Sequence, residues 1–274
     1  MSDQSSPFDA NPSQFLDAYA PARIAALVEA AGVRKSAMAT LPMLTLGVLA
    51  GAFIAFGGMF YALVMTGNEL GLGPGRMLGG IAFSLGLILV IVGGAELFTG
   101  NNLIVMAWAD KKVATGALLR NWSVVYVGNF IGSVATAVIM AYSGALELGN
   151  GAVGDTAMKI AQGKVALDPM QAFLRGILCN ALVCLAVWLT FAAHHVMGKI
   201  MAIIFPIAAF VALGFEHCIA NMYLIPVGML IGAEGVTIGG FIANLIPVTL
   251  GNIVGGSVFV ALVYWVIYLR EAKP

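Results

Sequence analysis

Two acidic residues stand alone within long apolar stretches of this sequence, and their surroundings occur twice. Glu96 is followed five residues later by Asn101, and Glu216 is followed in the same way by Asn221, 120 residues further along. A carboxylate at bilayer depth is costly, so it normally faces a cavity, a partner or a pore rather than lipid. The duplicated acid therefore predicts a transport protein.

The composition indicates an all-α membrane protein that crosses the bilayer several times. Of the 274 residues, 61% are hydrophobic, 9% are charged and 34 are glycine, and the mean hydropathy is +0.97. Thirteen basic and thirteen acidic residues give zero formal net charge. This balance gives no general electrostatic basis for binding nucleic acid.

Hydropathy predicts six membrane spans, several of them longer than the roughly 20 residues that a crossing helix needs. The spans cover residues 38–66, 76–109, 116–146, 169–193, 199–232 and 243–269. Their excess length predicts tilted or interrupted helices. Residues 1–36 are expected to form a cytoplasmic tail and an amphipathic surface helix, followed by a channel domain over 37–274.

The distribution of basic residues predicts the orientation in the membrane. With a cytoplasmic N-terminus, nine lysines and arginines fall on the cytoplasmic side: Arg23, Arg34, Lys35, Lys111, Lys112, Arg120, Lys199, Arg270 and Lys273. Four fall on the opposite side: Arg76, Lys159, Lys164 and Arg175. The positive-inside rule then places both termini in the cytoplasm, with the chain in the cytoplasmic (inner) membrane.

The cysteines and the other histidines show no metal-site spacing. Cys179, Cys184 and Cys218 lie within the predicted spans, and their odd number gives no disulfide framework. They are interpreted as small packing residues. His194 and His195 lie in a predicted cytoplasmic turn without a cysteine or carboxylate at ligand spacing. No metal or other cofactor is expected.

The repeat continues beyond the two acids. Asn121 precedes Asn129 by eight residues, and Asn244 precedes Asn252 by the same interval. Each copy then holds three spans, over about 37–146 and 169–270. An odd number of spans reverses the second copy, so the sequence predicts two inverted repeats with a pore at their interface.

The second and fifth spans are predicted to be broken. Gly93 and Gly94 precede the polar run 99–102, and Gly214 and Asn221 bracket the corresponding stretch. Glycine and asparagine tolerate turns, and irregular backbone at this depth requires a protein or water-filled surrounding. The free amides at such helix ends favour anions.

Four motifs in this order resemble the signatures of the formate/nitrite transporter family. They are residues 94–101 (GAELFTGN), 179–188 (CNALVCLAVW), 214–222 (GFEHCIANM) and 244–252 (NLIPVTLGN). The similarity runs from about residue 20 to 270. It implies an aquaporin-like protomer of six helices, assembled as a homopentamer in the lipid bilayer, with one pore in each protomer.

The resemblance also implies the pore residues. His217 matches the central histidine of the family, Thr99 matches a hydroxyl on the facing loop, and Lys164 matches a lysine near the periplasmic vestibule. Asn180 and Asn252 resemble polar residues close to the pore centre. Because an unperturbed histidine titrates near pH 6.5, His217 has two candidate roles, as a proton relay or as a hydrogen-bonding group.

Five apolar residues match the hydrophobic constrictions on either side of the family's central histidine: Phe83, Leu87, Leu97, Phe98 and Phe210. Such rings oppose a bare anion because dehydration is costly, yet they admit a neutral molecule. Glu96 and Glu216 are interpreted chiefly as loop anchors, because an ionised acid in the pore would repel an anionic substrate. Asn129, the repeat partner of Asn252, is a candidate for hydrogen bonding between helices.

The expected function is passage of a small monovalent weak-acid anion, with formate first and protons involved in its transfer. The stretch from Phe83 to Thr99 is most similar to the formate branch of the family. Nitrite and hydrosulfide are the alternatives within it. A neutral-solute channel of the aquaporin type is a further alternative, although the duplicated Asn-Pro-Ala motif is missing. Motifs of intramembrane enzymes are also missing, so the chain is not expected to be an enzyme.

Overall fold

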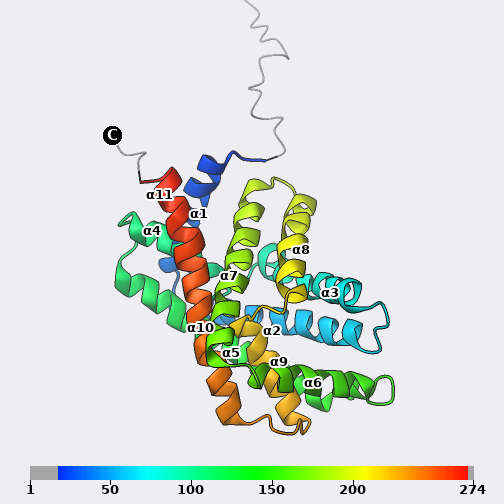
Figure 1. The fold of residues 1–274 in the computed structure, drawn as a ribbon. Helices are drawn as coiled ribbons and strands as arrows, with labels where there is room; N and C mark the ends of the chain where they lie inside the picture. Colours follow the sequence, from blue (N-terminus) through cyan, green and yellow to red (C-terminus); the bar gives the residue numbers. More distant parts are fainter. Residues whose placement is uncertain (1–17, 271–274) are drawn as a thin grey trace, which may run out of the picture.

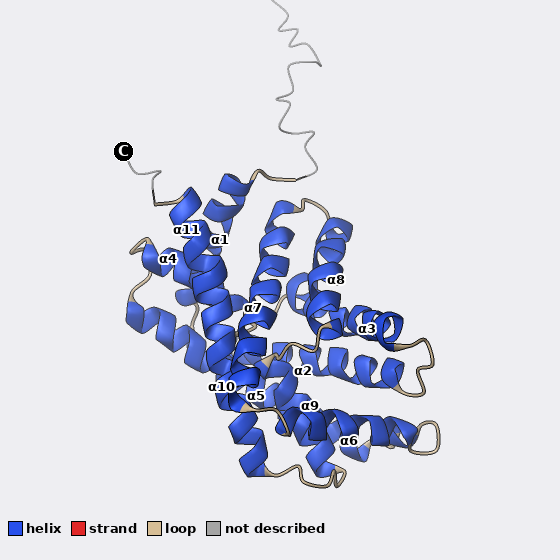
Figure 2. Cartoon of the chain, in the orientation of Figure 1, coloured by secondary structure: helices blue, strands red, loops and turns tan. Residues whose placement is uncertain are grey.

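The computed structural model describes residues 18–270, and the regular structure of this part is helical apart from one isolated bridge between Ala18 and Ala193 (Figures 1 and 2). Residues 1–17, which hold most of the predicted tail, and 271–274, which include Lys273, lie outside the described residues. The helices are α1 (Pro21–Ser36), α2 (Thr40–Met65), α3 (Leu72–Gly93), η2 (Gly100–Ile104), α4 (Val105–Ala109), α5 (Thr115–Tyr142), η3 (Ala145–Glu147), α6 (Ala152–Val165), α7 (Pro169–Ala192), α8 (Val196–Ala212), α9 (Cys218–Leu230), α10 (Ile238–Gly256), η4 (Ser257–Leu262) and α11 (Val263–Tyr268).

Within the described residues, five helical segments are long and apolar enough to cross a membrane. They are α2, α3, α5, α7 and the continuous run Ile238–Tyr268. The stretch 199–232, predicted as one span, is divided into α8, of 17 residues, and α9, of 13 residues. The stretch 76–109 is divided as well, because α3 ends at Gly93 and the next helical turn begins at Gly100. We call residues 94–99 the first break and residues 213–217 the second break.

Each break has, at or next to its first residue, a glycine whose backbone is left-handed. Gly94 has a φ of +85° and Gly214 a φ of +72°, which only glycine adopts without strain. The following N–H then bonds back into the helix that has just ended, Ala95 to Val90 O at 2.9 Å and Phe215 to Phe210 O at 3.0 Å. This bond satisfies a free carbonyl at the helix end, so both helices stop in the same way.

Two shorter helices occupy matching positions ahead of α2 and α7. Lys35 is the last residue but one of α1, and Lys164 is the last but one of α6. The sequence predicted α1 but not α6, whose 14 residues are too few to cross a bilayer. The prediction of a surface helix was incomplete, because α1 buries Ile24 and Val28 against the body of the protein.

Glycines allow two pairs of helices to pack at close range, α2 with α5 and α7 with α10. A Cβ at Gly132 would lie 1.9 Å from the carbonyl oxygen of Val48, and a Cβ at Gly251 would lie 2.2 Å from that of Phe173. Small residues at such crossings let the helix backbones touch, which is a main source of stability between helices in lipid. Close helix packing at glycines therefore stabilises each half of the protein in the same way.

Gly251→Ala is expected to lower the free energy of unfolding by about 1–3 kcal/mol, because the added methyl group forces α7 and α10 apart. Gly116→Ala is the matched control, since a Cβ there meets no atom within 4 Å. Thermal unfolding in detergent, followed by tryptophan fluorescence, measures both variants. Equal melting temperatures for the two would contradict the close-packing role of Gly251.

Candidate functional site

Two asparagines hold the two breaks by the same set of hydrogen bonds. Asn129 Nδ2 donates to Gly47 O at 2.8 Å and to Glu96 O at 2.9 Å, while its Oδ1 accepts the N–H of Phe98 at 2.9 Å. Asn252 Nδ2 donates to Gly176 O at 2.8 Å and to Glu216 O at 2.9 Å, while its Oδ1 accepts the N–H of Cys218 at 2.9 Å. One amide thus satisfies an N–H and a carbonyl oxygen at each break and joins them to a carbonyl oxygen of a neighbouring helix, α2 or α7.

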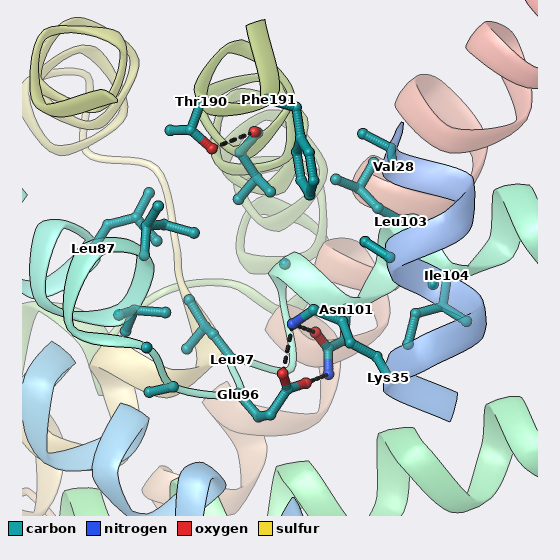
Figure 3. Close-up of a pocket in the computed structure, with 18 of the residues that line it drawn as sticks. Val28, Lys35, Leu87, Glu96, Leu97, Asn101, Leu103, Ile104, Thr190 and Phe191 are labelled. Atoms are coloured by element: carbon teal, nitrogen blue, oxygen red, sulfur yellow. Dashed lines mark hydrogen bonds and ion pairs between the residues drawn. The ribbon is translucent and has the colours of Figure 1, made fainter. Parts of the chain in front are cut away.

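The two acids are paired with lysines from the short helices. Lys35 Nζ lies 2.7 Å from Glu96 Oε1, and Lys164 Nζ lies 3.0 Å from Glu216 Oε1. Both carboxylates are about 95% buried. A buried carboxylate needs such a partner, since an uncompensated charge there costs several kcal/mol. Figure 3 shows the first pair, with Lys35, Glu96 and Asn101 joined by hydrogen bonds.

Four further asparagines complete these pairs in the same pattern. Asn101 Nδ2 donates to Glu96 Oε2 and to Asn121 Oδ1, whose own Nδ2 reaches Lys35 O. The corresponding bonds at the second break run from Asn221 to Glu216 and Asn244, and from Asn244 to Lys164 O. The structural repeat therefore begins at α1 and α6, ahead of the boundaries that the sequence predicted.

The only side-chain hydrogen bond within the described residues that joins the two breaks is between Thr99 and His217. Thr99 Oγ1 lies 2.9 Å from His217 Nε2, and both side chains are at least 97% buried. His217 Nδ1 accepts the N–H of Ala220 at 3.1 Å and so caps α9. This bond assigns the ring proton to Nε2, which donates it to Thr99 Oγ1. The hydroxyl proton of Thr99 is then free to bond a third group.

Asn180 contacts the backbone next to the Thr99–His217 pair. Its Nδ2 donates its two hydrogens to Asn252 O at 2.7 Å and to Asn102 Oδ1 at 2.8 Å, and Thr99 O lies 3.3 Å from the same nitrogen. Cys184 Sγ contacts the same Thr99 carbonyl oxygen at 3.4 Å. Both side chains are fully buried and hold the backbone that positions the Thr99 hydroxyl.

Two cavities approach Thr99 and His217 from opposite ends of α3. The Glu96-side vestibule has a volume of about 520 Å³, and its lining includes Lys35, Glu96 and Lys199, with Leu87 and Leu97 toward the centre (Figure 3). The Glu216-side vestibule has a volume of about 240 Å³, and its lining includes Lys164, Glu216 and His217, with Phe83 and Phe210. The rings of Phe83 and Phe210 meet edge to face, with centroids 5.7 Å apart.

Two predicted site residues have other roles in the structure. Phe98 packs edge to face on Tyr126, at 4.9 Å between centroids, and lines a separate apolar groove beside α5 and α10. It does not border either vestibule. The side chain of Asn252 makes its three hydrogen bonds to backbone groups and also lines neither vestibule.

Lys35 is a residue of the candidate site that the sequence interpretation missed. It was counted only as a cytoplasmic positive charge, yet it bonds Glu96 across 61 residues of sequence. Aligning the residues ahead of the two copies would have matched Lys35 with Lys164. Among residues 18–270, no group of three or more His, Cys, Asp or Glu side chains is placed to hold a metal ion.

Known proteins are similar to this chain both in sequence and in fold. The sequence model of the formate/nitrite transporter family matches residues 22–266. The chain is 41% identical to the formate channel FocA of Escherichia coli K12, over 93% of this chain and 96% of that protein. It is 46% identical to a probable formate transporter of Methanothermobacter thermautotrophicus, over 84% and 89% of the two chains.

Solved structures agree with these sequence matches. A pentameric formate channel with formate bound superimposes with a TM-score of 0.79 at 43% identity, over 84% of this chain and 98% of that one. A structure described as an ion channel of the same family superimposes with a TM-score of 0.82 at 28% identity. The chain is a membrane protein with several spans that belongs to the formate/nitrite transporter family.

Proposed function

We propose that this protein is a formate channel with one pore in each protomer of a homopentamer. The observation that carries the proposal is the Thr99–His217 hydrogen bond. This polar pair lies between apolar residues on both sides, and beyond them each vestibule is lined by cationic side chains. The names of the relatives support formate as the substrate, and the pentameric neighbour supports the assembly.

The proposed topology has six spans in two inverted repeats. In it, α3, the first break, η2 and α4 form the second span, and α8, the second break and α9 form the fifth. The duplicated hydrogen bonds at the breaks support this arrangement. Both termini lie in the cytoplasm and the protein lies in the cytoplasmic membrane. The contact between α1 and α11 at one end of the molecule supports a common side for the termini (Figure 1).

Passage begins with attraction of the anion by the lysines of a vestibule. Leu87 and Leu97 on one side, and Phe83 and Phe210 on the other, then oppose a hydrated charge. Taking up a proton makes formate neutral and lowers the cost of passing these walls. At the centre, the free hydroxyl proton of Thr99 bonds an oxygen of the substrate, which compensates part of its lost hydration.

The hydrogen bonds of His217 favour the hydrogen-bonding role over proton relay. Protonating Nδ1 would set two donors, Nδ1–H and the N–H of Ala220, against each other and remove the cap of α9. His217 then works by orienting the Thr99 hydroxyl. The proton that neutralises formate comes from a hydronium ion in the vestibule, which leaves a water molecule, and formic acid releases the proton to water again on the other side.

Flux through proteoliposomes tests this function. Formate is expected to cross faster than through empty liposomes, and faster than nitrite or hydrosulfide, with glycerol included to test an aquaporin-like channel. His217→Asn keeps a side-chain donor but cannot act as a proton relay, so the flux is expected to keep the pH dependence of the unsubstituted protein. If none of the three anions crosses above the background, the channel function is rejected; a changed pH dependence rejects only the role assigned to His217.

Thr99→Val removes the hydroxyl while keeping the size and branching of the side chain. Formate flux is expected to fall by roughly tenfold, the equivalent of about 1.4 kcal/mol for the lost hydrogen bonds. Thr99→Ser, which keeps the hydroxyl, is the matched control and is expected to stay within about twofold. A valine variant as active as the serine variant would show that the hydroxyl does not contact the substrate.

A further inference from the structure

The two vestibules have the same kind of ion pair in their walls but differ in their further charged residues. Each has a lysine–glutamate pair in its wall, Lys35–Glu96 or Lys164–Glu216. Of the described residues that line the Glu96-side vestibule, Lys199 is the one further charged side chain. Among those that line the Glu216-side vestibule there are three more, all cationic: Arg76, Lys159 and Arg175.

Arg175 can be compared directly with its counterpart in the other repeat. The backbone oxygen of Arg175 accepts the N–H of Glu216 at 3.3 Å, and the backbone oxygen of Leu46 accepts the N–H of Glu96 at 3.2 Å. Leu46 lines the Glu96-side vestibule just as Arg175 lines the other. The backbone oxygen of a leucine accepts the glutamate N–H equally well at the first break. The hydrogen bond that Arg175 makes to the second break therefore does not depend on its guanidinium group.

The contacts of the Arg175 side chain are also weak. Its Nη1 reaches Gly214 O at 3.5 Å, at the limit of a hydrogen bond. Arg76, in contrast, donates from Nε to Ala212 O and from Nη2 to Val211 O, where α8 ends. Arg76 therefore stabilises the turn into the second break, whereas the charge of Arg175 is not needed by the fold.

We propose that Arg175 is an affinity-determining residue that makes the Glu216-side vestibule the stronger collector of anionic substrate. With Lys159 it adds positive charge in front of Phe83 and Phe210. The channel therefore reaches half-saturation at a lower formate concentration from this side than from the Glu96 side. This inference rests on the proposed formate channel.

Electrostatics predicts the size and character of the effect. A unit charge about 8 Å from the path, in a water-filled vestibule with an effective dielectric constant of about 40–80, changes the local anion concentration by roughly two- to fivefold. Salt screens it, since the Debye length falls from about 30 Å at 0.01 M to about 3 Å at 1 M. A passive channel carries no net flux between equal concentrations, so the ratio of maximal flux to half-saturation concentration is the same from both sides. The maximal flux from the Glu216 side is therefore lower than that from the Glu96 side by the same factor as the half-saturation concentration.

The test is formate flux into membrane vesicles of each orientation, at low and high salt. Leu70→Cys marks the Glu216 side, because Leu70 is 59% exposed just ahead of α3, whose first turns carry Arg76 of this vestibule, and all three native cysteines are buried. A membrane-impermeant maleimide then reports which side faces outward. The marked protein is the parent for every variant.

At low salt, the parent is expected to show the lower half-saturation concentration from the marked side. Arg175→Leu is expected to raise that concentration two- to fivefold from the marked side only, and high salt is expected to abolish the change. Arg175→Lys keeps the charge and is expected to match the parent. Leu46→Arg, the reciprocal change, is expected to lower the half-saturation concentration from the opposite side.

Equal half-saturation from both sides of the parent would overturn the inference. An Arg175→Leu defect that is the same from both sides, that persists at high salt, or that Arg175→Lys also shows would overturn it too, because each of these indicates a structural role. If the parent carries no formate in either orientation, the proposed function itself has failed.

Discussion

The architecture depends on one constraint, the need to satisfy backbone groups that two helix breaks free inside an apolar protein. Water cannot serve these groups at bilayer depth, and each unsatisfied one costs several kcal/mol. Asn129 and Asn252 meet this need, each by accepting one N–H and donating to two carbonyl oxygens. Their primary amides carry both donors and an acceptor, which a hydroxyl or a carboxylate could not supply in the same number.

The same constraint explains why two acids are tolerated beside an anion path. Each carboxylate lies against a lysine, and an asparagine amide donates to its second oxygen. Charge is therefore balanced within the wall of each vestibule. The acids tie the short helices α1 and α6 to the breaks, and the additional cations determine the sign of the field that an approaching anion meets.

The Thr99–His217 hydrogen bond arises where the two copies differ. When Glu96 is aligned with Glu216, Thr99 corresponds to Ile219 and His217 corresponds to Leu97. The first copy thus contributes apolar Leu97 and polar Thr99, the second copy contributes polar His217 and apolar Ile219, and the two polar residues bond each other. Two identical copies would place either two threonines or two histidines at equivalent positions, and not one of each. The duplication provides the scaffold, and its divergence provides a single hydrogen-bonding point between apolar walls.

The sequence alone determined the family, the membrane class and the residues around the breaks, because glycines, asparagines and isolated acids in apolar runs have few other uses. The family resemblance was confirmed by the match over residues 22–266. The packing of Phe98 on Tyr126, the backbone hydrogen bonds of Asn252, the helix α6 and the pairing of Lys35 with Glu96 were decided only by the tertiary structure. Helical periodicity predicts which side chains share a face only while a helix is continuous, and the left-handed glycines at positions 94 and 214 end that continuity. Contacts between residues far apart in sequence depend on how the helices pack, which no local pattern encodes.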